Sequence, residues 1–126
     1  MKRDLDMMKT LLIAIESKGF DKPYLSLRDF QCKTPEEQYE ISGHMRLLIE
    51  DGLVEGKIDT FLGMKIADFR AMRLRSSGHE FLNLIRNDTV WNKTKDTILQ
   101  KGLEVSVETI KAVAAAAITS MLGLSA

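Results

Sequence analysis

The chain has 126 residues, of which 44% are hydrophobic and 29% are charged, and its 18 basic and 18 acidic side chains cancel. This composition is typical of one soluble domain that is large enough to bury its own core. The charge balance argues against binding to nucleic acid through an overall positive charge, although it allows a local basic surface. A single cysteine, Cys32, excludes an internal disulfide and fits a reducing compartment. We therefore expect one cytoplasmic domain.

Neither a signal peptide nor a membrane span is expected. The basic residues at the start are interrupted by Asp4 and Asp6 and are followed by no apolar run. The longest apolar run, 112–124, is too short to cross a bilayer.

Two helices are expected in the first half of the chain. Apolar residues in segment 3–17 recur at intervals of three and four positions, which predicts an amphipathic helix that Gly19 stops. The sequence TPEE at 34–37 supplies a cap, a proline and two acids in the order that starts a helix. That helix is expected to run to Asp51 and to end at Gly52. Its expected buried residues are Ile41, Met45 and Leu48.

Short extended segments are expected around the second helix. Leu25 and Leu27 predict a strand or an irregular connector, and either a short helix at 28–33 or a strand fits the spacing before the second helix. Segments 53–58 and 66–75 predict two strands joined by a loop. In the second of them, Met72 and Leu74 are expected to alternate with Arg73 and Arg75.

Three helices are expected in the last third, at 78–86, 88–101 and 106–122. The pair Ser77-Gly78 is expected to end the preceding element, and Asp88 or Thr89 to cap the second of the three helices. Ser106 is expected to cap the last one. Trp91 is expected to be a core residue.

This order predicts a mainly α fold with a small β-ribbon, in one domain that spans 1–126. Segment 1–75 would form a winged helix-turn-helix-like core, and 76–126 a C-terminal helical extension packed on it. In a winged helix, the helix before the ribbon is the usual recognition helix and the ribbon's loop is the wing.

Three segments resemble a known family: MKRDLDMMKTLLIAIE at 1–16, HMRLLIEDGLVEG at 44–56, and GHEFLNLIRNDTVWNKTK at 78–95. They are similar to the bacterial and phage family called domain of unknown function 2513, and the likeness covers nearly the whole chain. The resemblance implies a small winged-helix-like protein. It implies no activity, substrate or catalytic residue.

Catalytic and metal sites are not expected. His79 and Glu80 open a zinc-protease pattern, but Asn83 stands where the second histidine is required. Cys32 and His44 are scattered candidates without paired spacing. His44 is expected to be a hydrogen-bonded core or boundary residue, and Cys32 a small apolar filler. We therefore expect no enzyme, cofactor, metal or small-molecule substrate.

Charge is distributed unevenly between the two elements that could contact DNA. Segment 35–51 carries five acids against Arg46, whereas segment 57–75 carries five basic residues against two acids. A basic ribbon favours contact with phosphates, and the alternative is an edge strand that charge protects from pairing. The candidate nucleic-acid-binding residues are Arg46, Lys57, Lys65, Arg70, Arg73 and Arg75.

The last helix has a wide apolar face. Such a helix either closes the domain's own core or packs against a second copy, and we expect a homodimer. The candidate self-association residues are Val107, Ile110, Ala114, Ala117 and Met121.

Two hypotheses of function follow. The first is a non-enzymatic winged-helix module that binds double-stranded DNA and regulates phage or mobile-element genes, with contact through the ribbon more than through the acidic helix. The second is a protein-interaction adaptor that has the fold but no affinity for DNA.

Overall fold

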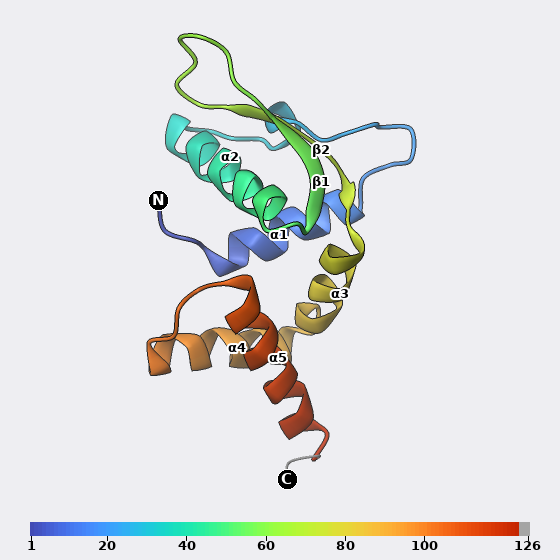
Figure 1. The fold of residues 1–126 in the computed structure, drawn as a ribbon, viewed down its shortest axis with the longest axis vertical. Helices are drawn as coiled ribbons and strands as arrows, with labels where there is room; N and C mark the ends of the chain where they lie inside the picture. Colours follow the sequence, from blue (N-terminus) through green and yellow to red (C-terminus); the bar gives the residue numbers. More distant parts are fainter. Residues whose placement is uncertain (124–126) are drawn as a thin grey trace. The chain divides into compact units, whose positions relative to one another are not determined.

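The computed structural model describes residues 1–123, so Leu124, the end of the apolar run, lies outside the described residues. The chain forms two compact units, Met1–His79 and Glu80–Ala126. Five α-helices and one two-stranded antiparallel sheet occur among the described residues (Figure 1). The expected mainly α fold with a small β-ribbon is confirmed. The single domain spanning 1–126 stays a prediction.

The first unit contains helices α1 (Leu5–Glu16) and α2 (Pro35–Glu50). The Asp4 carboxylate caps α1 by accepting from the N–H of Met7 at 3.1 Å. Thr34 Oγ1 caps α2 by accepting from the N–H of Glu37 at 3.1 Å, as the sequence predicts. Gly52 follows α2 with φ +77°, in the left-handed region that favours glycine at such an end.

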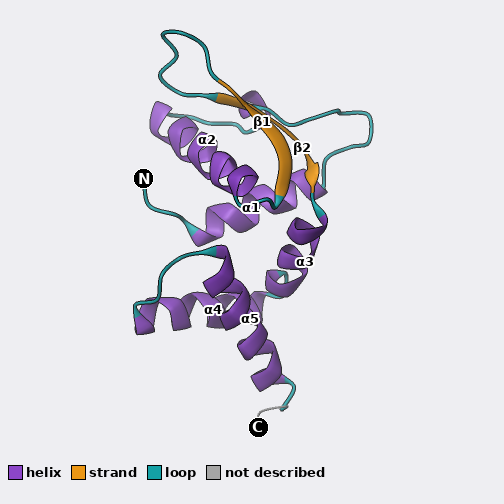
Figure 2. Cartoon of the chain, in the orientation of Figure 1, coloured by secondary structure: helices purple, strands orange, loops and turns teal. Residues whose placement is uncertain are grey.

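A long connection joins α1 to α2, and Figure 2 shows it mostly as loop. Leu25 forms one isolated bridge to Ala71, and their two N–H···O bonds are both 2.9 Å. A single 3₁₀ turn, η1 (Leu27–Asp29), then takes the place of the short helix or strand expected before α2. The backbone of the connection therefore pairs with the sheet at one residue, and the N–H of Leu27 adds a 3.0 Å hydrogen bond to the carboxylate of Asp68 on β2.

The sheet pairs β1 (Val54–Asp59) with β2 (Asp68–Leu74), and its register shifts between Glu55 and Gly56. Glu55 lies opposite Arg73 and Gly56 opposite Ala71, so Met72 is an extra residue in β2. The bulge shifts the buried side of β2 by one position along the sequence. Odd-numbered Phe69 and Ala71 are buried before the bulge, and even-numbered Leu74 is buried after it. The expected alternation from Met72 onward appears in the burial, because Met72 is half-buried and Leu74 is buried. Arg73 and Arg75, which alternate with them, are exposed.

The core of the first unit lies where α1, α2 and the ribbon pack against one another. The apolar residues with the least exposure are Met8, Leu11, Leu12, Met45, Leu48, Val54, Phe69 and Ala71. The rings of Phe30 and Phe69 lie 6.0 Å apart between centroids. Helix α2 buries Met45 and Leu48 as expected, and Ile41 is half-buried.

Helix α3 (Ser76–Ile85) begins two residues earlier than the sequence predicts. Ser77 and Gly78 lie in its first turn, so the expectation that they end the preceding element is wrong. A Cβ on Gly78 would lie 2.1 Å from the carbonyl oxygen of Leu53, which explains the glycine.

The second unit contains α4 (Asp88–Lys101) and α5 (Val107–Met121), which pack against each other. Asn87, rather than Asp88 or Thr89, caps α4 by accepting from the N–H of Val90 at 3.1 Å. Ser106 caps α5 as predicted. Trp91 is buried, as expected of a core residue. None of the described helices has the length and apolarity needed to cross a membrane.

Candidate nucleic-acid interface

The outward face of the ribbon carries equal numbers of acids and bases. Alternation along each strand, together with the register of the pair, places three charged residues of each strand on this face. They are Glu55, Lys57 and Asp59 on β1, and Asp68, Arg70 and Arg73 on β2. The basic excess of segment 57–75 in the sequence therefore does not become a basic surface on the ribbon.

Two of the candidate arginines are held in ion pairs on this face. Arg70 forms a bidentate pair with Asp59, in which Nε and Nη2 each lie 3.0 Å from a carboxylate oxygen. The hydrogen bond to Asp59 raises the pKa of the Arg70 guanidinium. Arg73 donates from Nε to Glu55 at 3.0 Å and from Nη1 to the carbonyl of Leu74 at 3.2 Å. Both arginines therefore present a locally neutralised charge to a phosphate.

Four candidate cations remain without an ion-pair partner in the described part of the chain: Arg46, Lys57, Lys65 and Arg75. Arg75 lies beyond the end of β2 and donates its backbone N–H to Leu53 at 2.9 Å, so it does not continue the strand face of Arg73. The structure therefore separates Arg75 from the β1–β2 loop, residues 60–67, by the whole length of β2.

Helix α2 has few side chains that could hydrogen-bond to the edges of bases in a DNA groove. Ser42 is buried, and its hydroxyl donates to the carbonyl of Ala67 at 2.6 Å. Glu36 and Glu50 are exposed, whereas Arg46 is the helix's one cation. Carboxylates on a helix that enters a groove would repel the phosphates on either side.

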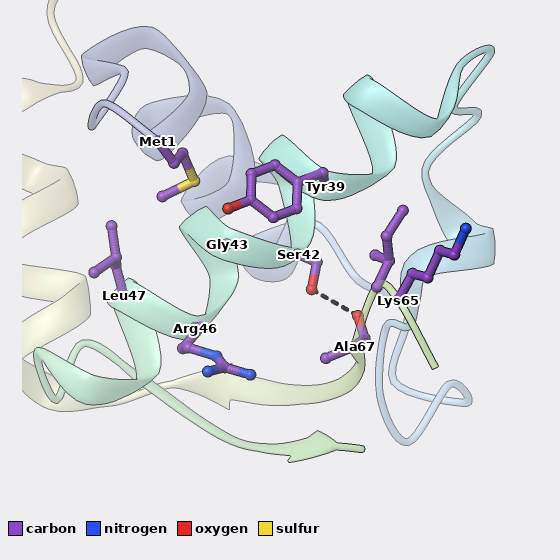
Figure 3. A pocket seen from close by; sticks show the side chains of 9 residues that line it. Met1, Tyr39, Ser42, Gly43, Arg46, Leu47, Lys65 and Ala67 are labelled. Carbon is purple, nitrogen blue, oxygen red and sulfur yellow. Dashed lines mark hydrogen bonds between the residues drawn. The ribbon is translucent and has the colours of Figure 1, made fainter. Parts of the chain in front are cut away.

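A cavity of about 290 Å³ lies between α2 and the β1–β2 loop (Figure 3). Tyr39, Arg46 and Lys65 supply polar groups to its lining. In Figure 3 the side chain of Lys65 points away from the guanidinium of Arg46, so the two cations do not converge on one point. Small-molecule sites need a few polar groups that converge, and this cavity lacks that arrangement.

The β1–β2 loop exposes large apolar side chains at its tip. The N–H of Met64 donates to the carbonyl of Phe61 at 3.0 Å, and Gly63 adopts φ +84° in this turn. Phe61 is 68% exposed, Met64 is 40% exposed and Leu62 is fully exposed. Figure 1 shows the loop at the end of the ribbon opposite to the one that leads into α3. Sequence reasoning missed this feature, whose signal was the apolar stretch TFLGM inside an expected loop.

The two histidines have different surroundings. His44 is fully buried, with Nε2 accepting from the N–H of Asp4 at 2.7 Å and Nδ1 lying 2.7 Å from the carbonyl of Glu40. A carbonyl can only accept, so Nδ1 carries the proton and both ring nitrogens are engaged. This confirms the expected hydrogen-bonded core histidine. His79 is exposed, and no group of three potential metal ligands occurs among residues 1–123.

Cys32 is half-buried beside η1 and α2. Burial, and then the carboxylate of Glu37, raise the pKa of its thiol. A raised pKa disfavours the thiolate that a nucleophile requires.

Most of the candidate self-association face lies inside the single chain. Ile110 and Ala114 are fully buried and Ala117 is 5% exposed, whereas Val107 is half-buried and Met121 is 48% exposed. Residues already covered within one chain are not available to a second copy. Ile110, Ala114 and Ala117 therefore pack within the chain, whereas Val107 and Met121 of the predicted face remain partly exposed. The homodimer through this helix stays a prediction.

Comparison with known proteins gives the family. A family model described as hypothetical protein, DUF2513, matches residues 2–104. A relative from Haemophilus influenzae strain Rd, named only as an uncharacterized protein, is 38% identical over 122 residues, which is 97% of this chain and 99% of the relative. No solved structure matches the chain. On both the family model and the relative, the chain belongs to the DUF2513 family.

Proposed function

We propose that the Met1–His79 unit is a non-enzymatic, winged-helix-like module that binds double-stranded DNA chiefly through the β1–β2 loop. In the cell it would act in the cytoplasm as a regulator of phage or mobile-element genes. The order of helix, single bridge, 3₁₀ turn, helix and ribbon supports this proposal, since a winged helix places α2 and the loop beside the duplex.

The exposed β1–β2 loop is the observation that carries the proposal. The outward ribbon face is neutral and α2 is acidic, so neither supplies the usual attraction for phosphates. The loop itself contains no carboxylate, and its Lys65, like Lys57 on β1, has no ion-pair partner among the described residues. A loop contacts few phosphates and therefore needs few cations, which a chain without net charge can supply locally.

Replacing Arg46, Lys57 and Lys65 with glutamine is expected to weaken binding to all duplex sequences. Each lost phosphate contact removes about 0.9 from the slope of log affinity against log salt, so the slope should fall by up to about three units. Fluorescence anisotropy over a salt series measures this change.

The matched control replaces both Glu55 and Arg73 with glutamine, which removes one ion pair and leaves the net charge unchanged. Its slope should equal that of the parent, because Arg73 is already neutralised by Glu55. An unchanged slope in the triple variant would rule out these three cations as the contact set.

The second candidate function is the protein-interaction adaptor. It is favoured by the neutral ribbon face together with the exposed apolar side chains of Phe61 and Leu62. In that case the loop would dock into an apolar pocket of a partner protein, and the chain would retain no duplex at moderate salt.

A further inference from the structure

We infer that the β1–β2 loop inserts Leu62, with Phe61 beside it, as an apolar wedge between base pairs from the minor groove, and so bends the duplex. This inference rests on the proposed function and specifies how the loop would contact DNA.

The first support is the concentration of apolar area at one point. Single exposed apolar residues are ordinary in soluble proteins. Here Phe61, Leu62 and Met64 occupy three of four consecutive positions in one turn, and at least 40% of each side chain is exposed. They contribute little to the core of the unit, so their exposure calls for a partner.

The second support is that the base of the loop is fixed. The hydroxyl of Ser42 ties Ala67 to α2 at 2.6 Å, and the next β2 residues include the buried Phe69. At the tip, Gly63 and the bond from Met64 to Phe61 form a turn. A loop that is ordered before contact loses less conformational entropy on binding.

The third support is the charge around the tip, which favours DNA over an apolar protein pocket. Residues 60–67 contain Lys65 and no acid. The two flanking carboxylates are engaged elsewhere, Asp59 by Arg70 and Asp68 by the N–H groups of Leu27 and Phe69. An apolar tip beside free cations matches minor-groove proteins, which wedge leucine or phenylalanine between base steps while cations meet the phosphates.

Sequence preference should follow from this mode of contact. The affinity of a wedge depends more on the energy needed to unstack and bend the duplex than on contacts with base edges. Pyrimidine–purine steps such as TA and CA/TG bend most easily. Bound duplexes should therefore be enriched in such steps, without an extended consensus of hydrogen-bonded bases.

The test uses the full chain and a short duplex with a central TA step, labelled with a donor and an acceptor dye at its two ends. Energy transfer reports bending, and anisotropy of a singly labelled copy reports affinity. The parent should bring the ends closer together. Leu62→Ser should abolish the bend and weaken binding on the order of tenfold, as removal of a central apolar contact does. Leu62→Met should keep both, because methionine can also wedge.

Leu99→Ser is the matched control, since Leu99 is an exposed leucine on α4, 81% accessible. It should bend and bind like the parent. A parent that binds without bending, or a Leu62→Ser variant that bends as the parent does, would overturn the wedge while leaving DNA binding in place. A parent that binds no duplex at all would overturn both the wedge and the proposed function.

Discussion

Trp91→Ala should lower the free energy of unfolding by about 3–5 kcal/mol, the range for removing a large buried aromatic side chain. Trp91 lies on α4 and is 4% exposed, and the ammonium of Lys95 lies 5.7 Å from its ring centroid. Alanine would leave a cavity where the indole stood and would remove this cation–π contact. Urea unfolding followed by circular dichroism measures the loss.

Two variants on the same helix separate packing from helix propensity. Trp91→Phe keeps most of the apolar volume and should cost distinctly less than alanine. Leu99→Ala removes an exposed side chain and should stay within about 0.5 kcal/mol of the parent. A Trp91→Ala variant as stable as Leu99→Ala would contradict the core position of the indole.

His44→Leu should lower the free energy of unfolding by about 1–3 kcal/mol, because it removes the acceptor of a part-buried backbone donor. The lost contact is the 2.7 Å hydrogen bond from the N–H of Asp4 to Nε2, which holds the start of α1 against α2. Leucine is an apolar side chain that can fill the same buried position. The loss in free energy of unfolding therefore comes mainly from the missing hydrogen bond. Thermal and urea unfolding both measure it.

The second histidine is the control, because His79 is exposed and its side chain makes no hydrogen bond within residues 1–123. His79→Leu should change stability by less than about 0.5 kcal/mol. Added zinc should not raise the melting temperature of the parent, since the two histidines share no ligand cluster among residues 1–123. If zinc raised the melting temperature of the parent but not that of His79→Leu, His79 would have to be a zinc ligand, and this interpretation would be wrong.

Local sequence rules were sufficient for most helix positions. The caps at Thr34 and Ser106 and the stop at Gly52 depend on residues within one turn, so pattern and chemistry predict them. The first residue of α3 could not be predicted from neighbouring residues alone. The pair Ser77-Gly78 has the composition of a break, whereas Gly78 lets the first turn of α3 approach the carbonyl oxygen of Leu53.

The ribbon shows why the candidate interface was less predictable than the fold. A register shift at Glu55 and Gly56 decides which residues of β2 are buried, and no local sequence pattern predicts this shift. The same register sets Arg73 opposite Glu55 and lets Arg70 reach Asp59 diagonally across the strands. The basic excess counted along the chain therefore cancels on this face. Net charge of a segment is a sequence property, but the charge of a face depends on register.

The C-terminal helix illustrates a further limit of sequence reasoning. An apolar stripe fits either an internal core or a second copy, and sequence alone left both open. Burial of Ile110 and Ala114 within one chain assigns that part of the stripe to internal packing.

Selection of bound DNA from a random pool of duplexes, near physiological ionic strength, tests most directly whether the β1–β2 loop binds DNA. The parent should retain duplex enriched in TA and CA/TG steps, and Leu62→Ser should retain far less. Retention of no duplex above the protein-free background would contradict the account, as would equal retention by the parent and by Leu62→Ser.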